Sequence, residues 1–193
     1  MQNLLNKVMG KLTLDKIPNY LLILVAAIIF YQYFGSDLIK LKADIGKTSS
    51  QTYNNQASSI TSNDLIAKIS TSQKPTLLFL YTTWCKTCHK TLPKINEIAR
   101  EFQNADVDFH VITIDKSINY RKTLVFLQKY PNIYFKPYYI SDNNIKSSLD
   151  QIDIKYKSTI PFTAILNGEN KVTYQFSGDK SLNYIRNRLI KSL

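Results

Sequence analysis

Cysteine and histidine are scarce in this chain of 193 residues, which contains two of each. A scaffold stapled by disulfides would spread an even set of cysteines over long loops, but here only two residues separate Cys85 from Cys88. A structural zinc site takes about four ligands, which would consume every cysteine and histidine present. The scarcity therefore argues against both kinds of scaffold, and the close pair indicates chemistry rather than stapling.

Dense runs of lysine and arginine are also absent, although the formal net charge is +11 and the sequence pI is about 9.5. The basic residues are scattered along the chain, so no nucleic-acid partner is expected, and an acidic bilayer surface matches the charge better. Hydrophobic residues make up 44% and charged residues 20% of the chain, which allows one folded core plus an appendage. The sequence contains no internal repeat.

Charge is missing altogether from residues 17–36, which include a long apolar run from Tyr20 to Phe30. Twenty helical residues span about 30 Å, the thickness of a bilayer's hydrocarbon core, and aromatic residues follow the run as in an interfacial belt. A cleaved signal peptide is the alternative, but residues 33–36 offer a poor cleavage site. A buried core helix fits less well because the segment has no polar stripe. The segment is therefore predicted to be an uncleaved transmembrane anchor.

Four regions follow from this anchor: a cytoplasmic tail over residues 1–16, the anchor over 17–36, a polar linker over 37–62 and a folded domain over 63–193. Residues 46–63 are rich in Ser, Thr, Asn and Gln, as in a tether. Three lysines flank the anchor on each side, so the positive-inside rule does not decide the orientation. Because a short leading tail usually stays in the cytoplasm, we expect a single-pass protein of the inner (cytoplasmic) membrane whose C-terminal domain lies in the periplasm.

The folded domain alternates strand and helix patterns before it ends in a hairpin and a helix. The continuous apolar run 76–81 suits a central strand buried on both faces. After it, apolar residues recur at helical spacing at Cys88, Leu92, Ile95, Ala99 and Phe102. Further strands are predicted over 107–114, 137–140, 162–166 and 172–176, and further helices over 63–71, 117–129, 144–152 and from residue 180. This order predicts an α/β sandwich.

The cysteine pair lies where the predicted central strand gives way to the helix, in the run Trp84-Cys85-Lys86-Thr87-Cys88. A cysteine at a helix N-terminus faces unpaired backbone N–H groups and the positive end of the helix dipole, which favour thiolate over thiol. Lys86 adds a nearby positive charge, and His89 is expected on the helix surface with a modest effect of the same sign. Cys85 is therefore the predicted attacking thiolate. Cys88, one turn further along the apolar face, is the predicted resolving thiol.

These residues resemble the thioredoxin family. The family's run Trp-Cys-x-x-Cys, a later helix proline and Glu-Ile-Ala correspond here to Trp84, Cys85, Cys88, Pro93 and residues 97–99. Downstream, residues 159–163 resemble the family's loop with a cis-proline, residues 167–168 its hairpin turn, and Gly178 the glycine after its last strand. The match covers residues 74–193 and links four separated features.

The resemblance implies the thioredoxin fold, a three-layer α/β/α sandwich. It also implies that Pro161 is cis and packs beside the cysteines, where it shapes a groove for a substrate backbone together with Thr159 and Ile160. Trp84, beside the exposed cysteine, is expected to join this docking surface.

Two features depart from thioredoxin itself. Residues 117–150 are longer than the corresponding connection and can hold an extra helix, strand and helix. This insertion makes the domain similar to the membrane-anchored thiol reductases of the TlpA/ResA type. The second departure is that thioredoxin's buried carboxylate falls on Phe79 here, so no acid is expected at that position.

The resemblance predicts thiol–disulfide exchange, in the direction of reduction, on extracytoplasmic proteins such as apocytochromes or oxidase subunits under assembly. The redox-active pair of Cys85 and Cys88 is the only redox centre needed, so neither a cofactor nor a metal is expected. The expected partners are protein thiols and disulfides, a membrane thiol that donates electrons, and the lipid around the anchor. An oxidase role stays open because the intervening Lys-Thr does not determine a potential.

Two other functions are compatible with a close pair of sulfurs. Cys85-x-x-Cys88-His89 is also the attachment pattern for a c-type haem, with His110 as the only other histidine. The preceding buried strand and the α/β pattern argue against a small cytochrome. Two soft thiolates could instead carry Cu(I), although copper carriers on this fold space their cysteines one residue wider.

Overall fold

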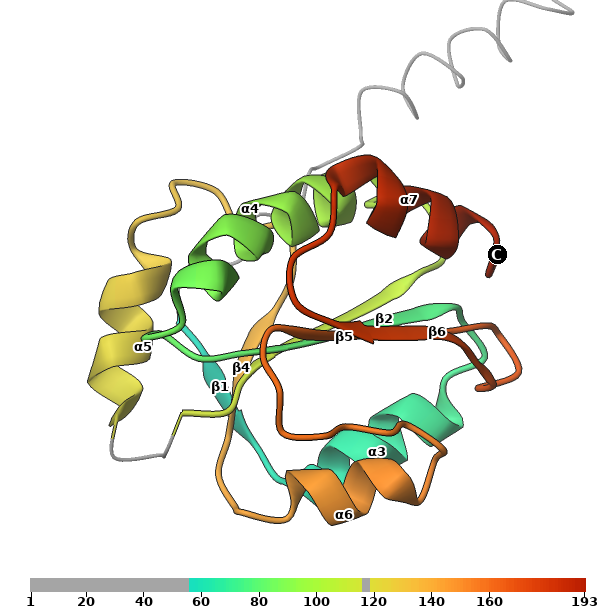
Figure 1. Ribbon diagram of the computed structural model, residues 1–193, viewed down its shortest axis with the longest axis horizontal. Helices are drawn as coiled ribbons and strands as arrows, with labels where there is room; N and C mark the ends of the chain where they lie inside the picture. The colour runs from blue at the N-terminus through green and yellow to red at the C-terminus, as the bar shows by residue number, and fades with distance from the viewer. Residues whose placement is uncertain (1–55, 116–118) are drawn as a thin grey trace, which may run out of the picture. The chain divides into compact units, whose positions relative to one another are not determined.

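The computed structural model describes residues 56–115 and 119–193, in which strands and helices alternate (Figure 1). The strands are β1 (Ser58–Ile60), β2 (Thr76–Tyr81), β3 (Asp108–Thr113), β4 (Pro137–Ile140), β5 (Phe162–Leu166) and β6 (Val172–Ser177). The helices are α3 (Ser62–Thr71), α4 (Lys86–Glu101), α5 (Tyr120–Leu127), α6 (Ile145–Asp150) and α7 (Leu182–Ile190).

The strands form one sheet in the order β1-β4-β3-β2-β5-β6. The first four in this order are parallel, and β5 and β6 extend the sheet as an antiparallel hairpin. Parallel neighbours need a crossover connection, and α3, α4 and α5 each lead from one parallel strand to the next along the chain. The predicted hairpin turn is held by Asn167, whose Oδ1 accepts hydrogen bonds from the backbone N–H groups of Glu169 (3.1 Å) and Lys171 (3.0 Å).

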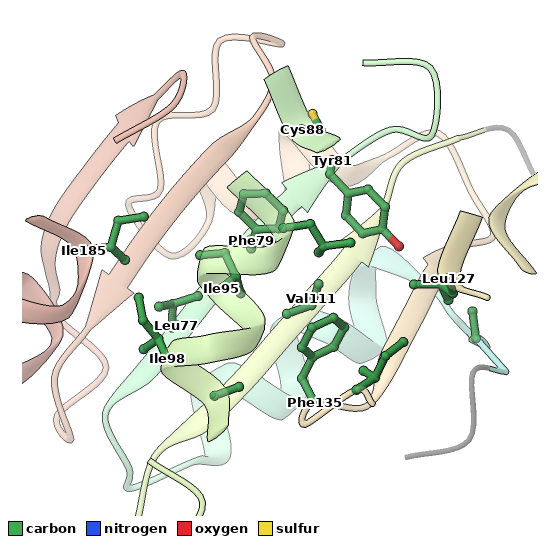
Figure 2. Packing of buried hydrophobic residues seen from close by; sticks show 14 of the residues in the cluster. Leu77, Phe79, Tyr81, Cys88, Ile95, Ile98, Val111, Leu127, Phe135 and Ile185 are labelled. Atoms are coloured by element: carbon green, nitrogen blue, oxygen red, sulfur yellow. The ribbon is translucent and has the colours of Figure 1, made fainter. Parts of the chain in front are cut away.

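Side chains of β2 alternate between two apolar cores, one on each face of the sheet. Leu77, Phe79 and Tyr81 pack with residues of α4, α5 and α7, and Figure 2 shows Phe79 and Tyr81 in this cluster with Ile95 of α4. Leu78 and Leu80 pack on the opposite face with residues of α3 and α6. Every residue of β2 is buried, as the continuous apolar run predicts. The helices therefore cover both faces, which confirms the predicted three-layer α/β/α sandwich (Figure 1).

The segment between β3 and β5 folds as helix α5, strand β4 and helix α6, in agreement with the predicted insertion. Strand β4 pairs with β3 on one side and β1 on the other, so it widens the parallel part of the sheet. Helix α5 contributes Phe126 and Leu127 to the apolar cluster that contains both cysteines. The insertion therefore reaches the end of the sheet from which the cysteine loop leaves.

Strand β1 corrects the predicted boundary between linker and domain. The polar composition predicts a linker that continues to residue 62, but Ser58–Ile60 pair with Tyr138–Ile140 of β4 at the sheet edge. Ile60 is buried, and Thr61 caps α3 by accepting a hydrogen bond from the Asp64 N–H at 3.1 Å. Pairing to β4 stabilises this short strand, which its own serine-rich sequence does not predict. The folded domain therefore begins before residue 63.

Four predicted features lie wholly or partly outside the described residues. The tail over 1–16 and the anchor over 17–36 are entirely outside them, and so is the linker up to residue 55. Where the chain is described, no helix is both long enough and apolar enough to cross a membrane. The predicted helix over 117–129 is present as α5, and residues 116–118 before it are not described.

Truncation of Ile60 tests whether β1 belongs to the fold. Ile60→Ala should lower the free energy of unfolding by about 2 kcal/mol, because it removes buried contacts and leaves a cavity. The neighbouring Ser59 is exposed, so Ser59→Ala should change this free energy by less than about 0.5 kcal/mol. Urea unfolding followed by circular dichroism measures both values. If Ile60→Ala changed the free energy of unfolding as little as Ser59→Ala, residues 58–60 would belong to the linker.

Candidate active site

Cys85 occupies the N-cap of α4, directly after the loop that follows β2. Its backbone is extended (φ −80°, ψ 108°), and its Sγ accepts a hydrogen bond from the Cys88 N–H at 3.2 Å. Such a cap satisfies one of the N–H groups that a helix leaves unpaired in its first turn. The bond strengthens when the acceptor carries negative charge. The sulfur of Cys85 thus lies at the helix tip, where the sequence predicts it.

Cys88 lies one turn further into α4 and is fully buried on the apolar face of the helix (Figure 2). Burial raises the pKa of its thiol to about 12, and the hydrogen bond with Cys85 acts in the same direction. Both cysteines are free thiols in this structure. Cys85 keeps 8% of its surface exposed, so the two sulfurs differ in their access to a partner.

The loop between β2 and Cys85 is held at Thr83 from two sides. The Thr83 N–H donates a hydrogen bond to Oδ2 of Asp115 at 2.8 Å. The Thr83 carbonyl oxygen lies 2.7 Å from Nε2 of His89, which is the donor in this pair. The ring of His89 also packs on Phe126, with 4.7 Å between the ring centroids. His89 therefore fixes the active-site loop, a role that the expected surface position does not include.

Asp115 is the residue of this site that sequence analysis missed. The parallel register pairs Tyr81 with Thr113, so the residues that follow β2 and β3 meet at the same edge of the sheet. Oδ2 of Asp115 also accepts a hydrogen bond from the Thr113 hydroxyl at 3.1 Å, whereas Oδ1 is buried with no partner among the described residues. An acid directly after a predicted buried strand is the signal that could have identified it. A buried carboxylate is thus present at the site although Phe79 occupies thioredoxin's position for one.

Tyr81 is buried at the end of β2 with its hydroxyl unpartnered among residues that the structure describes. Burial raises the pKa of the phenol far above its ordinary value, and the charges of Asp115 and Cys88 act in the same direction. The phenol therefore stays protonated. It can donate a hydrogen bond to a group that enters this space, but it cannot serve as a base.

The loop before β5 lies beside the end of β2, as the resemblance implies. Strand β5 is antiparallel to β2 with Phe162 opposite Leu80, so the residues that precede β5 reach the start of the cysteine loop. The Ile160–Pro161 peptide bond is cis. The carbonyl oxygen of Pro161 accepts a hydrogen bond from the Gly178 N–H at 2.8 Å, and the positive φ of Gly178 (82°) explains why glycine stands there.

A surface groove of about 660 Å³ opens beside these two loops. Its lining includes Trp84 from the cysteine loop, Ile160 from the loop before β5, and Asp115. Trp84 is 71% exposed, and Ile160 packs against the apolar cluster that contains both cysteines.

The remaining predicted site residues do not line the groove. Pro161 is buried, and Thr159 is exposed; neither contributes to the groove wall. Lys86 is exposed in the first turn of α4. The structure therefore brings Trp84 and Ile160 into one groove and leaves the other predicted residues outside its lining.

The geometry does not favour haem attachment at the cysteines. Cys88 is fully buried, so a thioether at its sulfur would force the first turn of α4 out of the core. His110 is paired with Leu78 in the sheet and so faces the side opposite to α4. Nε2 of His89 is directed to the Thr83 carbonyl. Neither histidine is placed to ligate an iron held by these sulfurs.

A thioredoxin-like sandwich with a Cys-x-x-Cys pair at the start of α4 defines the class of this protein, a thiol–disulfide oxidoreductase. The Redoxin family matches residues 54–188, and the chain belongs to this family. No curated protein sequence matches the chain.

Solved structures share the fold at low sequence identity. One is a thioredoxin-family thiol:disulfide interchange protein from Chlorobium tepidum TLS, with 13% identity, a TM-score of 0.52, and coverage of 65% of this chain and 83% of that chain. Another is a secreted disulfide oxidoreductase from Mycobacterium tuberculosis that is homologous to E. coli DsbE. It has 19% identity, a TM-score of 0.51, and coverage of 65% of this chain and 85% of that chain. At these identities the likeness concerns the fold.

If Asp115 acts by holding the Thr83 N–H, the exchange rate should depend on its hydrogen bond more than on its charge. Asp115→Ala removes the acceptor and should slow exchange with a disulfide-containing peptide about tenfold, which corresponds to about 1.4 kcal/mol, close to the lower limit for a hydrogen bond to a charged group. Asp115→Asn keeps an acceptor oxygen and should retain most of the rate. Stopped-flow kinetics at saturating reductant measure both variants. Equal losses would contradict the positioning role and assign the effect to the charge.

Proposed function

We propose that this protein is a membrane-anchored reductase of disulfides in extracytoplasmic proteins. The observation that carries the proposal is the unequal pair of sulfurs: Cys85 caps the helix next to the exposed Trp84, and Cys88 is fully buried behind it. In this proposal residues 17–36 form the anchor, surrounded by lipid, and the folded domain lies in the periplasm.

The proposed reaction starts with attack of the Cys85 thiolate on one sulfur of a substrate disulfide. The substrate's S–S bond breaks, its other sulfur leaves as a thiolate that takes up a proton, and a mixed disulfide forms on Cys85. The Cys88 thiol then loses its proton and attacks the Cys85 sulfur, which releases the second substrate sulfur as a thiolate. Two electrons have passed to the substrate, and the Cys85–Cys88 disulfide remains. A thiol donor in the membrane returns the electrons, so the cycle needs no further cofactor.

The residues around the pair have distinct tasks in this proposal. Trp84 and Ile160 form walls of the groove that receives the substrate chain. Thr159 and the cis Pro161 flank Ile160 and so position it in the groove wall. Lys86 provides positive charge at the helix tip. His89 acts through Thr83, whose carbonyl it binds, and so holds the loop in place.

The reducing direction is proposed from the resemblance to TlpA/ResA reductases. Burial of Cys88 supports its role as the resolving thiol, because it raises the pKa to about 12 and keeps this thiol protonated until a mixed disulfide forms on Cys85.

Two further considerations support the location and the substrates. The similar Mycobacterium tuberculosis protein is described as secreted, which agrees with an extracytoplasmic domain here. The resemblance to TlpA/ResA reductases points to the cysteines of apocytochromes or of oxidase subunits under assembly. Both remain part of the proposal.

Redox equilibrium with glutathione tests the direction. The full chain in detergent should show a two-electron transition with a potential between about −200 and −300 mV, in the range of thioredoxins and glutaredoxins. Cys88→Ser cannot form the internal disulfide and should show no such transition. A wild-type potential near about −120 mV, the value of a strong oxidant, would overturn the reductase proposal. Stoichiometric Cu(I) on the purified pair would favour the copper carrier instead.

Deletion of residues 17–36 tests the anchor. The shortened chain should move from the membrane fraction to the soluble fraction, because about 20 apolar residues supply the attachment. In intact cells with a permeabilised outer membrane, protease added from outside should degrade the domain of the full chain. A full chain that stays protected until the inner membrane is lysed would reverse the proposed orientation.

A further inference from the structure

A second groove lies on the other side of Trp84, against helix α5. Its volume is about 530 Å³, and Trp84 and Asn119 line both this groove and the one that contains Ile160. Its apolar lining comes from Trp84, Val125 and Phe126. Trp84 is 71% and Val125 55% exposed, so two large apolar side chains face solvent together next to the redox pair. Exposed apolar side chains that line a groove together can contact an apolar side chain of a bound molecule.

The rest of the lining is cationic. Arg121, Lys122 and Lys129 line the groove, and none of them forms an ion pair with any residue in 56–115 or 119–193. Some cations elsewhere are paired, such as Lys94 with Asp179 at 2.7 Å, but in this groove three cations that are unpaired among the described residues lie together. The sequence contains no Asp or Glu between Asp115 and Asp142, so the insertion offers no acid of its own to neutralise these charges.

The floor of this groove is continuous with the active-site loop. Phe126 lies in the groove lining and packs against His89 with the rings tilted and 4.7 Å between their centroids. His89 binds the carbonyl of Thr83, which is itself a lining residue two positions before Cys85. A molecule in the groove therefore contacts Thr83 and Trp84, the two residues that precede Cys85. A membrane surface seated here would cover Trp84 and obstruct a disulfide on its way to Cys85, whereas a polypeptide that brings its own disulfide would not.

We propose that the groove along α5 docks an acidic segment of the substrate polypeptide, with an apolar side chain of that segment between Trp84 and Val125. Carboxylates of the segment pair with Arg121, Lys122 and Lys129, which hold the substrate while its disulfide reaches Cys85. The docking rests on the proposed thiol–disulfide exchange and adds its selectivity: disulfides flanked by acidic and apolar residues react fastest.

Three disulfide-containing peptides test this selectivity on the full chain in detergent. They are identical except for four flanking residues, Asp-Leu-Asp-Asp, Ser-Leu-Ser-Ser or Lys-Leu-Lys-Lys. Rates are divided by the rate with hydroxyethyl disulfide, a small uncharged substrate. The wild type should reduce the acidic peptide about tenfold faster than the neutral one at low ionic strength. Added salt should lower this rate ratio, because it screens the charges. If the wild type did not reduce hydroxyethyl disulfide at all, the proposed exchange activity itself would be contradicted.

Charge reversal of the three groove cations tests whether this groove causes the preference for the acidic peptide. The triple variant Arg121→Glu, Lys122→Glu, Lys129→Glu should prefer the basic peptide. The matched control Lys68→Glu, Lys136→Glu, Lys191→Glu makes the same change in net charge at exposed positions outside both grooves and should keep the acidic preference. A fourth peptide, flanked by Asp-Ser-Asp-Asp, tests the apolar contact. Val125→Ser should reduce several-fold the ratio of the rate with Asp-Leu-Asp-Asp to the rate with Asp-Ser-Asp-Asp.

Two outcomes would overturn the docking proposal while leaving the exchange activity intact. The first is equal normalised rates for all three peptides with the wild type. The second is a lipid effect in proteoliposomes: anionic lipid slows reduction of the neutral peptide by the wild type but not by the triple variant. That result would assign the cations of α5 to the bilayer surface.

Discussion

The junction between β2 and α4 is the constraint on which the rest of the site depends. A helix that starts directly after a buried strand leaves its first N–H groups without partners, and here the sulfur of Cys85 accepts one of them from Cys88. The same bond completes the helix and holds the sulfur that we propose as the nucleophile. Because this sulfur caps the helix, it is positioned by the folding of the domain.

Neighbouring strands keep this junction in place. β3 is parallel to β2 and delivers Asp115 to the Thr83 N–H, whereas β5 is antiparallel to β2 and delivers the cis Pro161 loop to the same edge. Strand direction alone decides which end of each neighbour reaches the site. This explains why residues 30 and 76 positions beyond Cys85 in the chain lie around one loop.

Sequence patterns predicted the interior of this domain better than its edge and its polar contacts. The strands over 76–81, 137–140 and 162–166 have the predicted bounds, and buried apolar runs bounded by polar residues explain this. Strand β1 escaped prediction because three residues with a single buried aliphatic side chain become a strand only through pairing with β4. Asp115 escaped because its importance comes from a hydrogen bond across two strands, which no local pattern contains. The cysteine pair was predictable because its chemistry depends on local spacing.

The insertion has consequences for the chemistry as well as for the size of the sheet. Phe126 of α5 is buried, and its ring packs against those of His89 and Tyr81 with centroid distances of 4.7 Å and 5.7 Å, so it supports the residue that holds the active-site loop. The exposed side of the same helix carries Val125, Arg121 and Lys122, and Lys129 follows its C-terminal end. A partner that presses on α5 therefore acts on the helix that also holds His89 against Thr83. In the proposed docking, one helix would both bind the substrate at its exposed side and hold His89 through the buried Phe126.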